Sequence, residues 1–270
     1  MKSAINRSVI GSFILISAVW KMSKAGVANR LRFGLLELIP QLLYYLAMSI
    51  IVLLMFSVIR DQTIPMRDLV IFLLVMYAVD SLGDALIFKG IGEYCASLRR
   101  GQTMYYLLSP GMPLFKVIFL RWDLPMLGLG AICGLGAILL SWMFYATNPI
   151  LIALALLFGT FTHVVLTSAF HIIQAYFDPT MPIALGSPST RFYTKPMHLF
   201  VSGSVSLTFL MTFYPAYFMT AFPAGLAIQQ TQGVLTQYAT ACYLVGALFL
   251  CLWIFMLNAV IKSSCRRRQN

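Results

Sequence analysis

The sequence predicts an all-α membrane protein with six transmembrane helices. Hydrophobic residues make up 60% of its 270 positions and charged residues only 10%, whereas soluble domains are about 45–50% apolar and about 25% charged. Mean hydropathy is +0.85. The apolar runs are long and continuous, unlike the alternating strands of a membrane β-barrel. A soluble globule and a disordered chain are excluded, because both need far more polar surface.

The first 33 residues predict a helix that lies in the membrane interface. The apolar stretch from Val9 to Trp20 has roughly 12 residues, fewer than the 17–25 that a span needs. Lys21 and Lys24 follow it, where a signal peptide would carry the small residues of its cleavage site. We therefore expect residues 1–33 to lie on the cytoplasmic surface, with their basic side chains extending to lipid headgroups.

Six later stretches are long enough to cross a bilayer, which takes about 20 apolar residues. They are predicted at 34–59, 69–88, 124–144, 150–176, 204–222 and 238–261. The long connections are 89–123, 177–203 and 223–237. No internal repeat is visible, so residues 1–270 are expected to form one transmembrane domain without a soluble domain.

The basic residues fix the expected orientation, because lysine and arginine accumulate in cytoplasmic segments. With both termini cytoplasmic, all but Arg60 and Arg67 of the 19 basic residues fall inside. The net charge of +11 is therefore assigned to the membrane surface, and no nucleic-acid partner is expected.

Asp80 and Asp84 are the most unusual polar residues of the second span. At spacing i and i+4 they share one helix face, and carboxylates at membrane depth normally face a bundle interior or a wet cavity. One interpretation is a substrate pathway or a proton-relay pair. The other is hydrogen bonding to neighbouring helices, with Asp84 close enough to Lys89 to reach its ammonium group.

His163 and His171 lie eight residues apart on the fourth span and are expected to form interhelical hydrogen bonds. They cannot form a metal site without distant carboxylates, and the five cysteines contain no C-x-x-C pair, so no metal is expected. On the third span, Gly130 and Gly134 form a G-x-x-x-G pair that allows close helix contact.

The fifth span is interrupted by proline. Pro215 breaks the helix and Pro223 closes the segment, which favours a short re-entrant or cap element over an ordinary kink. We assign Phe213, Tyr214, Pro215 and Tyr217, together with Asp80 and Asp84, to the substrate pathway.

The connection 89–123 is long, basic and amphipathic. Arg99, Arg100 and Gly101 are expected to end a helical turn. Beside them an exposed patch is predicted to form a docking surface for a protein partner; its residues are Met104, Tyr105, Tyr106, Leu107 and Leu108. The alternative is an interfacial helix that lies on lipid.

The sequence contains no phosphate-binding loop, no dinucleotide fingerprint and no hydrolase, zinc-protease or kinase signature. Any energy for uphill transport therefore comes from a partner or an ion gradient, and the chain itself is not expected to be an enzyme.

Several short motifs together resemble the ABC-2 family of permeases, in the small six-span group whose ATPase is a separate chain. They are Val79-Asp80-Ser81-Leu82, Arg99-Arg100-Gly101 with the later Pro110, Arg121 with Asp123, Pro215-Ala216-Tyr217-Phe218, and Pro223-Ala224. Met104 and Ser109 stand where the family usually carries an acidic and a basic residue, so a hydrophobic contact would replace the polar one.

The resemblance implies the ABC-2-type exporter fold and the function of a permease subunit in a bacterial inner membrane. Two permease chains, identical or homologous, would form the pathway. Two cytoplasmic ATPase subunits would bind ATP and Mg²⁺ and contact residues 89–123, through Arg99, Arg100, Gly101, Tyr105, Tyr106, Leu107 and Pro110. This chain would bind no cofactor itself.

Two other functions are compatible with the residues. A gradient-driven transporter would use Asp80 and Asp84 as proton sites, although no inverted repeat is visible. A membrane enzyme would use the two histidines and the aspartates, although no nucleophile supports it.

Overall fold

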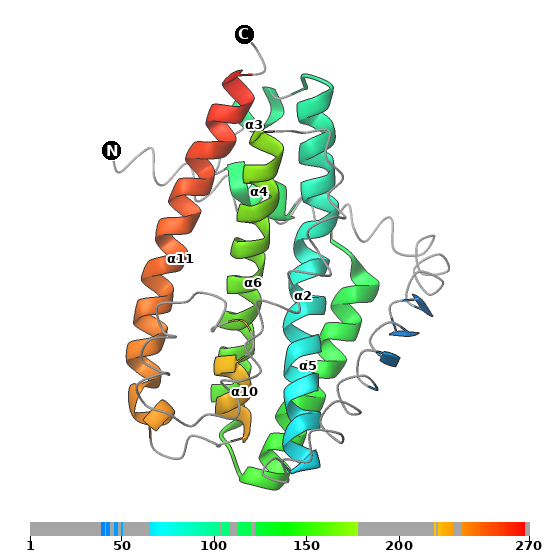
Figure 1. The fold of residues 1–270 in the computed structure, drawn as a ribbon, viewed down its shortest axis with the longest axis vertical. Helices are drawn as coiled ribbons and strands as arrows, with labels where there is room; N and C mark the ends of the chain where they lie inside the picture. The colour runs from blue at the N-terminus through cyan, green and yellow to red at the C-terminus, as the bar shows by residue number, and fades with distance from the viewer. Residues whose placement is uncertain are drawn as a thin grey trace.

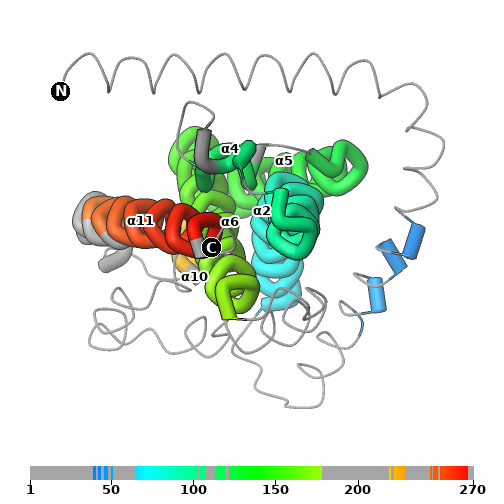
Figure 2. Tube along the Cα trace, turned by 90° about the horizontal axis from the view of Figure 1, so that it is seen from above, coloured from blue at the N-terminus to red at the C-terminus, as the bar shows by residue number. Residues whose placement is uncertain are grey.

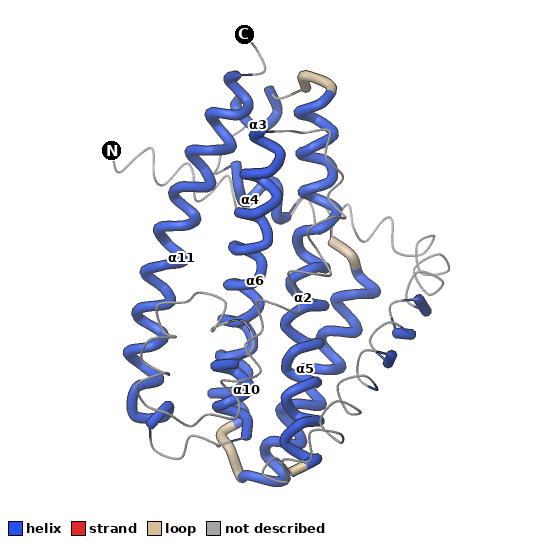
Figure 3. The backbone as a smooth tube through the Cα atoms, in the orientation of Figure 1, coloured by secondary structure: helices blue, strands red, loops and turns tan. Residues whose placement is uncertain are grey.

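The structure is a computed structural model that describes residues 65–102, 104–108, 113–119, 122–177, 221–228 and 234–267, with residue 219 and a few positions between 39 and 50. This part of the chain is helical and contains no strand (Figure 3). Its helices are α2 (Met66–Arg99), α3 (Met104–Leu108), α4 (Pro113–Phe119), α5 (Leu124–Tyr145), α6 (Pro149–Phe177), α10 (Ala221–Ile228) and α11 (Val234–Arg267).

Helix α2 forms the centre of the bundle. It packs against α4, α5, α6 and α10, while α6 also packs against α11. Figure 1 shows α2, α6 and α11 running in one direction and α5 in the other, and Figure 2 shows the same helices end-on. The short helices α3 and α4 lie at the end where α2 and α11 finish, and α10 lies toward the opposite end (Figure 1).

Four described helices are long and apolar enough to cross a membrane, as expected for an integral membrane protein. They are α2, α5, α6 and the Gly246–Arg266 part of α11, and they overlap the spans predicted at 69–88, 124–144, 150–176 and 238–261. The spans predicted at 34–59 and 204–222 and the interfacial helix at 1–33 lie largely or wholly outside the described residues, so six spans stay a prediction.

The connection predicted from residue 89 begins as a helix, because α2 continues to Arg99. Its 34 residues give a length of about 51 Å at about 1.5 Å per residue, against about 30 Å for a hydrocarbon core. Hydropathy falls after Phe88, but no proline interrupts the helix there. Helix α2 is therefore long enough for its last turns to extend beyond the bilayer.

Helix α5 places its small side chains inward and its large apolar ones outward. Gly130, Gly134, Ala137 and Ser141 are buried, whereas large side chains on other faces are exposed: Ile132, Leu135, Leu139, Trp142 and Met143. A side chain at Gly130 would place its Cβ 2.7 Å from Leu82 of α2. The close helix contact predicted for the G-x-x-x-G pair is thus confirmed, and the outer apolar surface suits lipid.

Helix α10 is a short helix at the second proline of the fifth segment, and its role as a re-entrant or cap element stays a prediction. It runs over eight residues and packs against α2, α5 and α6, with Phe222 and Ala224 fully buried. Pro223 lies in its first turn, where a proline is tolerated because that N–H has no partner within the helix. The prediction that Pro223 closes the segment is therefore wrong.

The two ends of the bundle differ in charge. The last turns of α2 and α11, together with α4, carry the described basic residues Arg99, Arg100, Lys116, Lys262 and Arg266, whereas Arg67 lies at the start of α2. Helices α3 and α4 and the last turns of α2 and α11 are predicted to lie on one side of the membrane, and they lie toward one end of the bundle. That this side is cytoplasmic stays a prediction.

Candidate functional site

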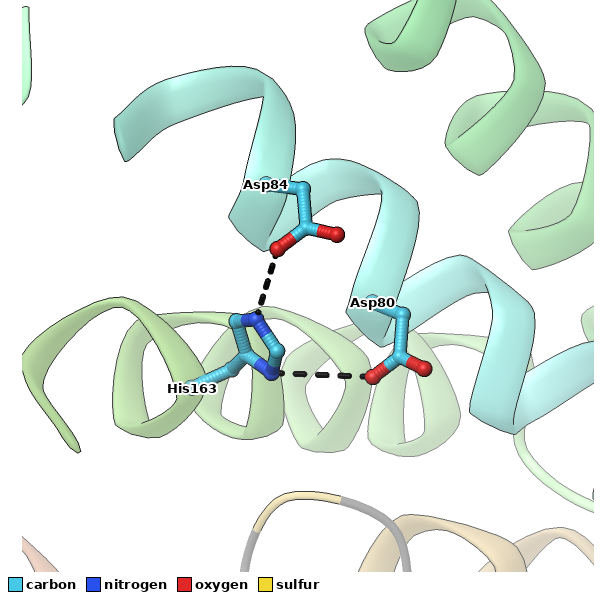
Figure 4. Close-up of polar contacts among 3 residues, drawn as sticks. All are labelled: Asp80, Asp84 and His163. Atoms are coloured by element: carbon cyan, nitrogen blue, oxygen red, sulfur yellow. Dashed lines mark hydrogen bonds and ion pairs between the residues drawn. The ribbon is translucent and has the colours of Figure 1, made fainter. Parts of the chain in front are cut away.

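A buried carboxylate pair lies on the central helix. Asp80 and Asp84 share one face of α2, as predicted, and their residues are only 3% and 2% exposed. Both face His163 of α6, as Figure 4 shows. The site lies between two apolar cores, because one core uses α2 residues up to Val79 and the other begins at Ile87.

His163 bridges the two carboxylates. Its Nε2 lies 3.1 Å from Asp84 Oδ1, and its Nδ1 lies 3.6 Å from Asp80 Oδ1. The residue is 2% exposed. We call Asp80, His163 and Asp84 the triad. The interhelical hydrogen bond expected for His163 is confirmed, and its partner is Asp84.

Gly83 makes room for the imidazole. A Cβ on Gly83 would lie 2.3 Å from His163 Cδ2, far inside van der Waals contact. The ring therefore rests on a glycine that stands between the two aspartates in the pattern Asp80-x-x-Gly83-Asp84. Gly83 is not among the residues predicted for the site, although a glycine between two carboxylates that share a helix face is a signal for a close neighbour.

The expected contact between Asp84 and Lys89 is wrong. Lys89 Nζ pairs instead with Asp123 Oδ2 at 2.8 Å, and the Asp123 N–H donates to the Ala85 carbonyl at 2.8 Å. Lys89 stands at position i+5 from Asp84, beyond the i+3 or i+4 spacing that brings side chains together on a helix. Lys89 therefore fixes the start of α5 against α2.

The described residues contain no group of three histidine, cysteine, aspartate or glutamate side chains that could hold an ion. The two carboxylates face different nitrogens of one imidazole (Figure 4), so they cannot close around one ion together. His171 is also buried, but its ring packs on Phe170 and Phe88 at 5.8 and 6.4 Å between centroids.

A second candidate site lies at the basic end of the bundle. Helix α2 ends at Arg99 and Gly101 adopts φ +71°, a left-handed conformation that favours glycine after a helix. The predicted termination at Arg99, Arg100 and Gly101 is thus confirmed. Both arginines are exposed, and beyond the turn Met104 and Tyr105 are 55% and 44% exposed.

The predicted exposure of Tyr106 is wrong. The residue is 3% exposed, and its ring meets Tyr94 edge-to-face at 5.2 Å between centroids. Burial raises the pKa of the Tyr106 phenol above its usual range. Neighbouring residues on a helix point about 100° apart, so Tyr105 faces outward while Tyr106 anchors α3.

Several predicted site residues are not covered by the described part of the structure. Leu107 lies in α3, but its side chain lies outside the described residues, as does Pro110. The same holds for the pathway residues of the fifth span, which are Phe213, Tyr214, Pro215 and Tyr217. Their predicted roles stay predictions.

Two polar contacts that were not predicted join α11 to α4 and to α2. The Leu114 N–H of α4 donates to Asn258 Oδ1 of α11 at 3.0 Å. The Tyr94 hydroxyl of α2 bonds the Ser264 hydroxyl of α11 at 2.6 Å. These contacts join segments 144 and 170 residues apart, so no local sequence pattern indicates them.

Lys116 adds a contact within this region. Its ammonium group donates to the Tyr105 carbonyl at 3.4 Å and lies 5.6 Å from the centre of the Tyr105 ring. Burial lowers the pKa of the Lys116 ammonium. The backbone of α3 is thereby tied to α4, while the Tyr105 residue stays exposed.

No protein-family model, curated protein or solved structure matches this chain.

Proposed function

We propose that this chain is the transmembrane subunit of an ATP-binding cassette exporter and that α3 is its contact with a separate ATPase. The observation that carries the proposal is the surface formed by Arg99, Arg100, Met104 and Tyr105 at the basic end of the bundle. We call these four residues the coupling surface. All four are exposed.

The chemistry of the coupling surface suits a protein partner. Arginine, tyrosine and methionine are enriched at the centres of protein interfaces, and arginine and tyrosine are frequent among the residues that dominate binding energy. A lipid surface would instead require a continuous apolar face. The buried Tyr106 and the Asn258–Leu114 bond provide the rigid support that a force-bearing contact needs.

The position of the coupling surface suits transmission of movement. Helix α3 follows directly from α2 and packs on α11, so a displacement of α3 reaches two long helices. The sequence contains no nucleotide-binding motif, and ATP and Mg²⁺ are therefore assigned to two partner ATPase subunits. A second permease chain, identical or homologous, would complete the pathway across a bacterial inner membrane, with both termini cytoplasmic.

The proposal is tested by binding of candidate ATPases to the purified chain in lipid nanodiscs. We expect Arg99→Ala with Arg100→Ala, or Tyr105→Ala, to weaken binding about 30-fold, the equivalent of about 2 kcal/mol. Arg67→Ala is the matched control, because Arg67 is an exposed arginine at the other end of α2. Equal binding by all variants, or binding that never requires this end of the chain, would refute the coupling assignment.

One observation favours a second candidate, a transporter driven by a proton gradient. A histidine that bridges two buried carboxylates is the kind of side-chain set that carries protons through membranes. If this candidate is correct, transport stops in Asp80→Asn with Asp84→Asn and continues without ATP. Transport that survives the double substitution and stops when ATP is removed would exclude it.

A further inference from the structure

Two buried polar atoms of α6 have no hydrogen-bond partner in the described part of the chain. They are Thr160 Oγ1 and His163 Nδ1, and their residues are 5% and 2% exposed. A buried polar group without a partner is costly, and few such groups occur in native proteins. Residues three apart on a helix are neighbours on one face, so these two atoms indicate a common partner.

Asp80 of α2 lies at the same depth as Thr160. Two contacts fix the register of α2 against α6, and each joins a residue of α2 to one of α6: Ala78 and Leu156, which a Cβ on Gly134 would touch together, and Gly83 with His163. The two helices run in the same direction (Figure 1), so Asp80 and Thr160 both fall between these contacts. Asp80 Oδ1 lies 3.6 Å from His163 Nδ1, which is too long for a hydrogen bond.

The hydrogen bond to Asp84 determines what His163 Nδ1 can do. His163 Nε2 lies 3.1 Å from Asp84 Oδ1 (Figure 4), and an ionised carboxylate only accepts hydrogen bonds. Nε2 therefore carries the N–H, and in a neutral imidazole Nδ1 is then an acceptor. Asp80 Oδ1 is an acceptor as well, so the 3.6 Å contact requires a donor that serves both atoms.

We propose that the α2–α6 contact holds one ordered water molecule, bound by His163 Nδ1, Asp80 Oδ1 and Thr160 Oγ1. The two O–H groups of the water donate to the imidazole and to the carboxylate, and its oxygen accepts from the threonine hydroxyl. A buried water typically makes about three hydrogen bonds, and a polar contact longer than about 3.5 Å is a common place for a bridging water. We call this arrangement the water site.

The water site requires no unusual protonation state. A carboxylate oxygen accepts more than one hydrogen bond, so Asp80 keeps its other interactions while it accepts from the water. The imidazole of His163 stays neutral. The proposal is independent of the ATPase coupling described above, because it concerns the packing of α2 on α6 and not the source of energy for transport.

Thr162 shows how a neighbouring hydroxyl is satisfied without water. Its Oγ1 donates to the Phe158 carbonyl at 2.9 Å, and the residue is 2% exposed. Thr160 is the same residue type on the same helix and is also buried, but its hydroxyl makes no such bond. The two threonines therefore form a matched pair, of which only Thr160 contributes to the water site.

The test uses the full chain in lipid nanodiscs and X-ray radiolytic footprinting read by mass spectrometry. Radiation converts water into hydroxyl radicals, which oxidise side chains next to a water molecule. We expect His163 to be oxidised although it is buried, with the exposed Met104 as the reference for dose. Thr160→Val should lose most of the oxidation at His163, because valine removes a ligand of the water. Thr162→Val should retain it.

Thermal unfolding gives an independent readout of the same site. A buried hydroxyl without any partner costs free energy, so its removal in Thr160→Val would raise the melting temperature. A hydroxyl bound to an ordered water gives the opposite result, because a buried water is costly to remove. The proposal therefore predicts that Thr160→Val lowers the melting temperature.

The outcomes separate this proposal from the proposed function, because neither measurement requires an ATPase or transport. Oxidation of His163 that is lost in Thr160→Val and retained in Thr162→Val, together with the lower melting temperature, supports the water site. An unoxidised His163 in the unmodified chain, equal oxidation in the two variants, or a higher melting temperature in Thr160→Val overturns it.

Discussion

Gly83 and His163 form the smallest unit on which the site depends. The missing side chain at Gly83 lets the ring lie on the backbone of α2, within reach of a carboxylate one residue after it and another three residues before it. Any Cβ at this position must displace the ring or the helix that carries it. The geometry of the triad is therefore set by a residue that has no chemistry of its own.

Gly83→Ala is predicted to destabilise the chain by about 1–3 kcal/mol, the usual cost of overpacking a close contact. Gly92→Ala on the same helix is the control, because nothing lies within 4 Å of the point that a Cβ would occupy there. That control should stabilise α2 by about 0.5–1 kcal/mol, since alanine favours a helix over glycine. Unfolding in detergent followed by circular dichroism measures both, and equal effects would show that the ring does not rest on Gly83.

Single residues also show how much of the site could be predicted from the sequence. Helical spacing places Asp80 and Asp84 on one face, and the cost of burying charge predicts an interhelical partner for them. Neither identifies His163 as that partner, because the register between two helices depends on packing far from the site. The exposure of Tyr106 is mispredicted because five successive apolar residues suggest one surface, although a helix turns neighbours to different sides.

At the scale of elements, α11 supports the short helices of the basic end. Pro113 opens α4 and has no N–H, so Leu114 carries the first donor that lacks a partner within the helix. Asn258 of α11 accepts that donor and in turn donates to the Ile254 carbonyl at 2.8 Å. A side chain from a distant transmembrane helix thus serves as the cap of α4.

Replacement of Asn258 is predicted to loosen α4 without unfolding the bundle. Asn258→Leu leaves the Leu114 N–H without its acceptor, at a cost of about 1–3 kcal/mol. Hydrogen exchange should therefore accelerate over Pro113–Phe119 and stay unchanged over α5. Asn258→Asp keeps the accepting oxygen and should preserve protection, and identical exchange in both variants would argue against the cap.

At the scale of the whole molecule, the positions of the long helices can be predicted wherever hydropathy alone determines them. Continuous apolar runs locate α5 and α6 nearly to the residue, because the polar residues Thr147 and Asn148 separate the two runs. The same signal does not mark the end of α2, since hydropathy drops at Lys89 while the helix continues to Arg99. The contacts of α3 and α4 with α11 are beyond prediction, because they join segments far apart in the chain.

The orientation of the whole molecule is a separate prediction. In a chain without native cysteines, Tyr105→Cys should react only with a reagent supplied from the cytoplasm. Met66→Cys, at the start of α2 and also exposed, should react only from the outside. The physical reason is the excess of lysine and arginine at the α3 end, and reaction of Tyr105→Cys from outside intact cells would reverse the orientation.

The central claim is that a cytoplasmic ATPase binds the coupling surface, and a photo-crosslinker placed at Tyr105 in living cells tests it most directly. The same crosslinker at Met66 is the control for the opposite end. We predict that position 105 captures an ATP-binding cassette subunit, identified by mass spectrometry, and that Arg99→Ala with Arg100→Ala reduces the yield. Capture of lipid alone at position 105, with no cytosolic ATPase, would contradict the claim.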